Sequence, residues 1–180
     1  WNVAVAGEYA YVADGGAGVR VVDISTPESP QIVGSVGSNG DARGIAVSGP
    51  HAYVANGNAG LLIVDITNPL SPHAVGREIT SGFAGSMAVL GTPAYVTTHY
   101  LGVQVMDVSN PQAPRSVGCV LTPSAARDVA ALDNHVYVAT GESGLSIIPA
   151  QCADGTPVFL GSFDALSEGN AVIIRWAVSA

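Results

Sequence analysis

Arg43 and Arg127 are the residues of this chain whose type and spacing best suit binding chemistry. Each carries a planar guanidinium fork, which fits a carboxylate or another small anion. Each also lies near an aspartate, Asp41 beside the first and Asp128 beside the second. Two interpretations follow: a small anion site, or exposed ion pairs that hold loops. We favour the ion pairs, because such contacts are common and contribute little energy.

The histidines point less clearly to chemistry. His51 and His135 hold equivalent places, His73 opens an expected strand, and His99 lies in an expected loop. No two of them have the close spacing on one element that aims two side chains at one metal. We therefore expect neither a metal nor a cofactor. The chain also has no Gly-x-Ser-x-Gly elbow and no phosphate-binding glycine loop, so we expect no catalytic residue.

A repeat of 42 residues must position these side chains. Its markers are four tyrosines and four glycines: Tyr11, Tyr53, Tyr95 and Tyr137, with Gly18, Gly60, Gly102 and Gly144. A period of about 40–45 residues with several short β runs is typical of propeller blades. The sequence therefore predicts an all-β fold, a β-propeller of four four-stranded blades. They form either a four-bladed ring or part of a larger one.

Each copy contains four expected strands. The third is apolar at nearly every position, as in 61–66 and 103–108, so both of its faces should be buried between neighbouring blades. It ends at Asp23, Asp65 or Asp107, each followed by a Pro-x-x-Pro turn. We expect these aspartates to accept backbone N–H bonds in the turn, a structural role that needs no ligand. The tyrosines should likewise be packing residues.

The repeats divide the chain into a propeller, 1–163, and a C-terminal segment, 164–180. The copies span 1–41, 42–83, 84–125 and 126–163, and the fourth departs from the pattern at Pro149. Residues 171–178 read as one longer strand rather than the start of a fifth blade. Cys119 and Cys152 fall in or near outer strands of neighbouring copies. Whether they pair as a disulfide stays open.

The loops that differ between copies all fall on one side of the predicted disc. Antiparallel strands place the connections after strands two and four on one face, opposite the constant Asp-x-x-x-Pro turns. Loops that vary on a constant scaffold are where recognition usually lies. The candidate binding residues on this face are Asp14, Asp41, Arg43, His99, Tyr100, Arg127, Asp128 and Glu142, with Asn56, Asn58 and Phe83 beside them.

Composition excludes several partners. Hydrophobic residues make up 48% of the chain and charged residues 11%, which indicates a packed domain. The net charge is −8, and the six basic residues are all arginines scattered along the chain. Nucleic acid and anionic membranes both require clustered basic residues, so neither is an expected partner. No apolar run approaches the roughly 20 residues that cross a bilayer, so we expect no membrane insertion.

Three segments resemble a known family. GVRVVDISTP (18–27), GLLIVDITNP (60–69) and GVQVMDVSNP (102–111) are similar to LVIVD repeats, propeller-forming units of secreted or surface proteins. The resemblance implies an extracellular or cell-surface propeller within a larger protein, and it supplies no catalytic residues. Residues 158–180 resemble the opening strands of fibronectin type III-like domains. Their alternative is an extra edge strand on the last blade.

These features favour a non-enzymatic interaction or scaffold module that binds a protein or a carbohydrate through the variable loop face. The alternative is a propeller hydrolase or lyase at the mouth of the central channel, with Arg43, Asp128 and His99 as its best trio. An enzyme should gather several polar groups in one pocket, whereas these candidates are spread thinly. A third expectation is self-association, or a larger assembly, through open blade faces.

Overall fold

The computed structural model describes residues 1–99 and 101–150, together with the backbone of 160–168 and 171–178. The described chain is all-β apart from one short 3-10 turn, η1 (Gly141–Ser143). No helix in this part of the chain is long and apolar enough to cross a membrane. The predicted fold class is confirmed.

Three antiparallel four-stranded sheets follow one another along the chain. The first contains β1 (Asn2–Ala6), β2 (Tyr9–Ala13), β3 (Val19–Asp23) and β4 (Gln31–Val36). The second contains β5 (Gly44–Ser48), β6 (His51–Ala55), β7 (Leu61–Asp65) and β8 (His73–Glu78). The third contains β9 (Met87–Val89), β10 (Pro93–Thr97), β11 (Val103–Asp107) and β12 (Arg115–Val120). In each sheet the strands pair in chain order, as blades of a propeller do.

The fourth sheet is shorter than the others among the described residues. It contains β13 (Asp128–Leu132), β14 (His135–Ala139) and β15 (Leu145–Pro149). β15 ends at Pro149, where the first three blades have the turn aspartate, and proline has no side-chain acceptor for that turn. Instead of adding a fourth strand here, β16 (Leu160–Glu168) pairs with β17 (Ala171–Val178) in a separate two-stranded sheet. β17 has the bounds of the longer strand that the sequence predicted, whereas a fibronectin-like start stays a prediction.

Apolar side chains pack between successive sheets. The strand β7 is buried on both faces, as its unbroken apolar run predicts: Leu62 and Val64 contact the first blade, while Leu61 and Ile63 contact the third. Complete burial of such a side chain contributes about 1.5–3 kcal/mol. Tyr53 is also buried, and this burial raises the pKa of its phenol. The tyrosine is therefore a packing residue, as expected.

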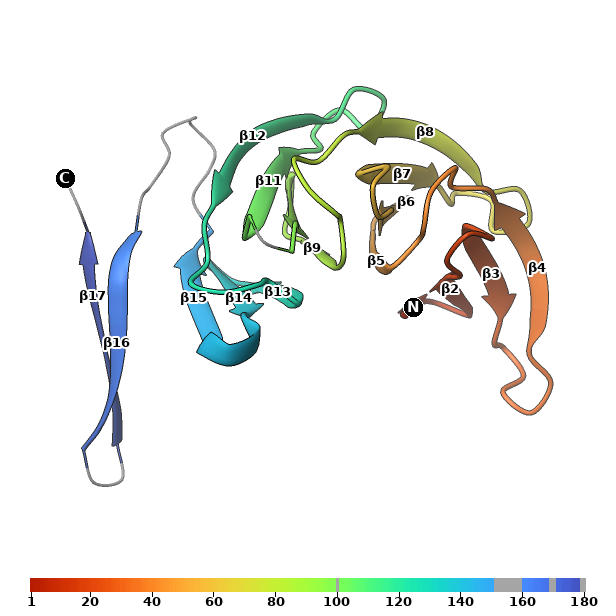
Figure 1. Ribbon diagram of the computed structural model, residues 1–180. Coiled ribbons are helices and arrows are strands. Elements are labelled where there is room, and N and C mark those ends of the chain that lie inside the picture. The colour runs from red at the N-terminus through yellow and green to blue at the C-terminus, as the bar shows by residue number, and fades with distance from the viewer. Residues whose placement is uncertain (100, 151–159, 169–170, 179–180) are drawn as a thin grey trace.

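The four blades form an open arc, with β1, β5, β9 and β13 in succession along its inner edge (Figure 1). The two end blades each expose one apolar face. Val3 and Val5 are 57% and 62% exposed on the first blade, and Leu132 and Leu145 are exposed on the fourth. The described blades do not close into a four-bladed ring, and whether they form part of a larger ring stays a prediction. The expected self-association through such faces stays a prediction.

Candidate functional site

The variable face carries the β2–β3, β6–β7, β10–β11 and β14–β15 turns and the β4–β5, β8–β9 and β12–β13 connections. On this face, backbone hydrogen bonds join each blade to the next, and we call each such pair of bonded residues a clasp. In the first clasp, Gly15 and Ala42 exchange two N–H···O bonds of 3.0 Å. Gly57 and Ala84 repeat the exchange one blade later. In the third clasp the Ala126 N–H donates to the His99 carbonyl oxygen at 2.9 Å. These constant contacts hold the variable side chains on either side of them.

His99 is the exception in this series of clasps. The equivalent residues in the other copies are Gly15, Gly57 and Gly141, all with positive φ. His99 has φ 59° and therefore also adopts the left-handed conformation, which costs a residue with a side chain roughly 1–2 kcal/mol. Non-glycine residues held in such conformations cluster at functional sites. The backbone thus singles out His99 as a position kept for its side chain.

Arg43 is held between two aromatic rings and one carboxylate. Its Nε lies 2.7 Å and its Nη2 lies 2.5 Å from Asp41 Oδ2. Its Cζ lies 5.8 Å from the centre of the Trp1 ring and 5.7 Å from that of Phe83, both cation–π distances. The predicted Arg43–Asp41 ion pair is therefore confirmed. Asp41 balances the charge of the guanidinium group, and two aromatic rings lie within cation–π range of it.

Arg127 has a different environment. Its Nη1 lies 3.4 Å from His99 Nε2, across the third clasp. Asp128, the expected ion-pair partner, accepts a hydrogen bond of 2.5 Å from Ser86 Oγ instead. The pairing predicted for Arg127 and Asp128 is therefore wrong, because Asp128 faces the equivalent position of the preceding blade.

The remaining candidates do not join this group. Asp14 forms an ion pair of 2.5 Å with Arg20 on its own blade, and Glu142 is exposed in η1. Tyr100 lies outside the described residues. Of the best catalytic trio, Arg43, His99 and Asp128 each engage a different partner, as described above.

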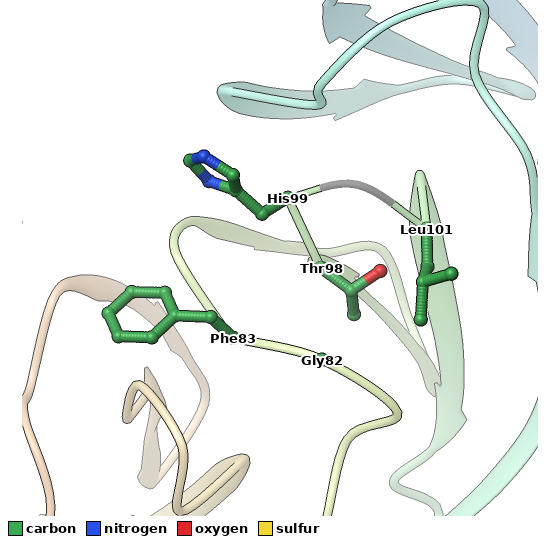
Figure 2. A pocket seen from close by; sticks show the side chains of 5 residues that line it. All are labelled: Gly82, Phe83, Thr98, His99 and Leu101. Carbon is green, nitrogen blue, oxygen red and sulfur yellow. The ribbon is translucent and has the colours of Figure 1, made fainter.

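An open hollow of about 390 Å³ lies beside Phe83 and His99. Gly82, Thr98 and Leu101 complete its lining, so the β8–β9 connection and the β10–β11 turn form it together. In Figure 2 the rings of Phe83 and His99 both extend to the left of the view, and the Leu101 side chain lies at the right. Leu101 is 42% exposed, which leaves apolar surface in contact with solvent. The hollow has a size typical of small ligand sites, although it is less enclosed.

We use the term axial strip for the side chains that follow the inner edge of the variable face. They are Trp1, Asp41, Arg43, Phe83, His99 and Arg127. The rings of Trp1 and Phe83 both lie near the guanidinium group of Arg43, and the members of the strip come from all four copies of the repeat. Four of the eight predicted binding residues lie on it: Asp41, Arg43, His99 and Arg127.

The opposite face is built by local turns. Ser25, Thr67 and Ser109 donate their backbone N–H to Asp23, Asp65 and Asp107 at 2.8–2.9 Å. Hydrogen bonds from the side chains and backbone N–H groups of Ser25, Thr67 and Ser109 hold the pKa of each carboxyl below its ordinary value. The pKa of Asp107, which also contacts Arg115, falls to about 2. The structural role predicted for the three aspartates is confirmed.

The LVIVD repeat family matches the chain four times, over residues 1–37, 39–80, 81–122 and 123–149. The chain belongs to the LVIVD-repeat family. The family boundaries keep the 42-residue period and divide each LVIVD unit a few residues earlier than the sequence analysis did. No curated protein matches the chain.

Solved structures share the fold of these LVIVD units. The chain is similar to the computationally designed Ika8 protein, with TM-score 0.67 and 12% identity over 97% of this chain and 57% of that one. The designed Ika4 protein gives a TM-score of 0.66 and 13% identity over 83% of this chain and 90% of that one. BamB from Moraxella catarrhalis gives a TM-score of 0.65 and 14% identity over 83% of this chain and 44% of that one. The chain thus spans about half the length of Ika8 and BamB, and at such identities the likeness shows the fold alone.

Trp1 belongs to the strip but was not among the predicted binding residues. Trp1, Arg43, Gly85 and Arg127 share one position of the LVIVD unit, so this equivalence was the available signal. His99 carried a similar signal, because it replaces a glycine present in three copies.

Among the described residues, no group of three His, Cys, Asp or Glu side chains could hold a metal. Cys119 is exposed on β12, and Cys152 lies outside the described residues, so their pairing stays a prediction.

Proposed function

We propose that this chain is a non-enzymatic interaction or scaffold module of a secreted or cell-surface protein. It binds a protein or carbohydrate partner through the variable face. The observation that carries the proposal is the axial strip, in which side chains from successive blades meet above constant backbone clasps. Trp and Arg are the residue types most enriched among the side chains that dominate binding energy at protein interfaces. The extracellular location rests on the resemblance of the repeats to secreted and surface proteins.

The strained backbone of His99 supports recognition at this face. A glycine would relieve the strain, as it does in the other three copies. A histidine retained at such a cost is explained by a role for its imidazole at the surface. The two loops that line the hollow differ in sequence from their counterparts in the other blades, as specificity-determining loops do.

A screen with two arms tests the proposal. Peptides displayed on phage and an array of extracellular glycans are both presented to the wild-type chain. Binders are then measured against a variable-face variant, Arg43→Ala with Phe83→Ala and Arg127→Ala. The matched control changes the opposite face, with Thr67→Ala, Leu70→Ala and Ser109→Ala. We expect the selected binders to lose at least tenfold in affinity for the first variant and to keep their affinity for the control. Binders that show the reverse pattern would refute the proposal.

The alternative function, a hydrolase or lyase at the channel mouth, requires Arg43, His99 and Asp128 to act on one bound group. Their different partners disfavour it. Chromogenic esters, glycosides and uronides provide the assay. Turnover by the wild-type chain that disappears in His99→Ala would replace the interaction proposal with the enzymatic one.

A further inference from the structure

We infer that the hollow at Phe83 and His99 receives an apolar side chain that lies next to a single carboxylate, in a peptide segment of a partner protein. The inference rests on the proposed function and names its ligand chemistry. The lining of the hollow gives the first part of the argument. Phe83, Leu101 and the buried Thr98 offer mainly carbon surface, and covering the exposed part of Leu101 removes apolar area from water.

Arg127 supplies the charge. The ion pairs among the described residues are Arg20–Asp14, Arg43–Asp41 and Arg115–Asp107. Arg127 is exposed, and its contact at the hollow is with the imidazole of His99. Its guanidinium group therefore has N–H donors available beside an apolar cavity. A carboxylate accepts two such bonds in parallel, which fixes its orientation as well as its position.

The neighbouring Arg43 has a different role. Asp41 already engages its Nε and Nη2 atoms, and the rings of Trp1 and Phe83 lie at cation–π distances from its Cζ. It therefore holds the Phe83 ring at the edge of the hollow. A ligand carboxylate at Arg127 would not compete with Asp41, so a single carboxylate completes the charge balance of the strip.

The charge of the whole chain limits the ligand further. A net charge of −8 repels polyanions at long range, so a segment with many acidic groups is disfavoured. A carbohydrate would need polar groups for its hydroxyls. Asp41, the carboxylate of the strip, is instead committed to Arg43, and Asp128, next to Arg127 in the chain, accepts a hydrogen bond from Ser86. An apolar side chain with one carboxylate satisfies both constraints.

The experiment compares three small probes by NMR titration of the isotope-labelled chain. They are N-acetylphenylalanine, its uncharged amide and glucuronic acid. Ligands of this size bind with dissociation constants of about 1 mM. We expect the acid to bind about tenfold more tightly than the amide, with shifts at His99 and Leu101. Arg127→Gln removes the difference between acid and amide, and Leu101→Ser weakens both.

Arg115→Gln is the matched control, because it removes an exposed arginine from the outer strand β12. It should leave both affinities unchanged. Equal binding of acid and amide overturns the inference, as does a loss in Arg115→Gln equal to that in Arg127→Gln. Glucuronic acid binding at the strip more tightly than N-acetylphenylalanine also overturns it, while the proposed function stands. If in addition the screen yields binders that ignore the variable-face variant, the proposed function fails too.

Discussion

The two faces of the arc are built from the same repeat but held by different kinds of contact. On the constant face, defined by the Asp-x-x-x-Pro turns, each aspartate bonds a backbone N–H two residues away. On the variable face the side chains join different blades, as Ser86 does with Asp128 and Arg127 with His99. Local hydrogen bonds within each copy thus keep one face of the repeat constant, while the other face can carry residues that differ between copies.

The largest expected effect tests the contacts between blades near the outer strands. At Gly76 an added Cβ would overlap the carbonyl oxygen of Pro111, in the constant turn of the next blade. Gly76→Ala should therefore lower the free energy of unfolding by about 3 kcal/mol. Gly118→Ala is the matched control, since nothing lies within 4 Å of its Cβ, and it should change stability by less than about 0.5 kcal/mol. Chemical denaturation measures both variants, and equal effects would contradict a close contact between Gly76 and the Pro111 carbonyl oxygen of the next blade.

The second prediction compares two asparagines, one on each face. Asn56 is buried and donates from Nδ2 to the Ser38 carbonyl oxygen at 2.8 Å, which links two blades. Asn68 accepts a local bond of 3.1 Å from the Leu70 N–H in an exposed turn. We expect Asn56→Ala to cost about 2 kcal/mol and Asn68→Ala about 0.5 kcal/mol. A larger loss at Asn68 in denaturant titrations would reverse the comparison between the faces.

The third prediction has the opposite sign. His99→Gly should raise the stability by about 1 kcal/mol, because glycine adopts positive φ without strain. The reciprocal change Gly57→Ala should lower it by a similar amount, since its Cβ would also lie 3.2 Å from Asp41 Cβ. Thermal unfolding measures both variants. A destabilised His99→Gly would mean that the imidazole supports the fold rather than recognition.

The smallest expected effect is on the stability of the fold at acidic pH. The pKa of Asp107 is about 2 in the folded chain, against an ordinary value of 3.8, and those of Asp23 and Asp65 are also lowered. A lowered pKa stabilises the fold above the ordinary value, and this contribution is lost as pH falls toward 2. Asp107→Asn should therefore reduce the fall in melting temperature between pH 4 and pH 2 by about 2 °C. An unchanged slope would show that this carboxylate does not contribute to acid sensitivity.

The periodic features of the fold could be predicted from the sequence. The strands, the two buried faces of β7 and the turn aspartates all repeat, and local bonds follow from local residues. The pairing of Asp128 could not be found in this way, because its partner Ser86 lies one whole repeat away. The cation–π contacts of Arg43 were missed for the same reason, because Trp1 and Phe83 belong to neighbouring units of the repeat. Contacts between copies depend on the angle at which blades meet, which no single copy encodes.

The place of the axial strip has a mechanical consequence. The inner strands β1, β5, β9 and β13 pack against one another, and the outer strands β4, β8 and β12 lie farther from the centre of the arc. A rotation between neighbouring blades is therefore centred near the inner strands. A small change in the angle between blades then moves the outer strands by a long lever arm and the inner edge by a short one. The surface proposed for recognition is therefore the part of the arc that deforms least, even when the curvature of the whole arc changes.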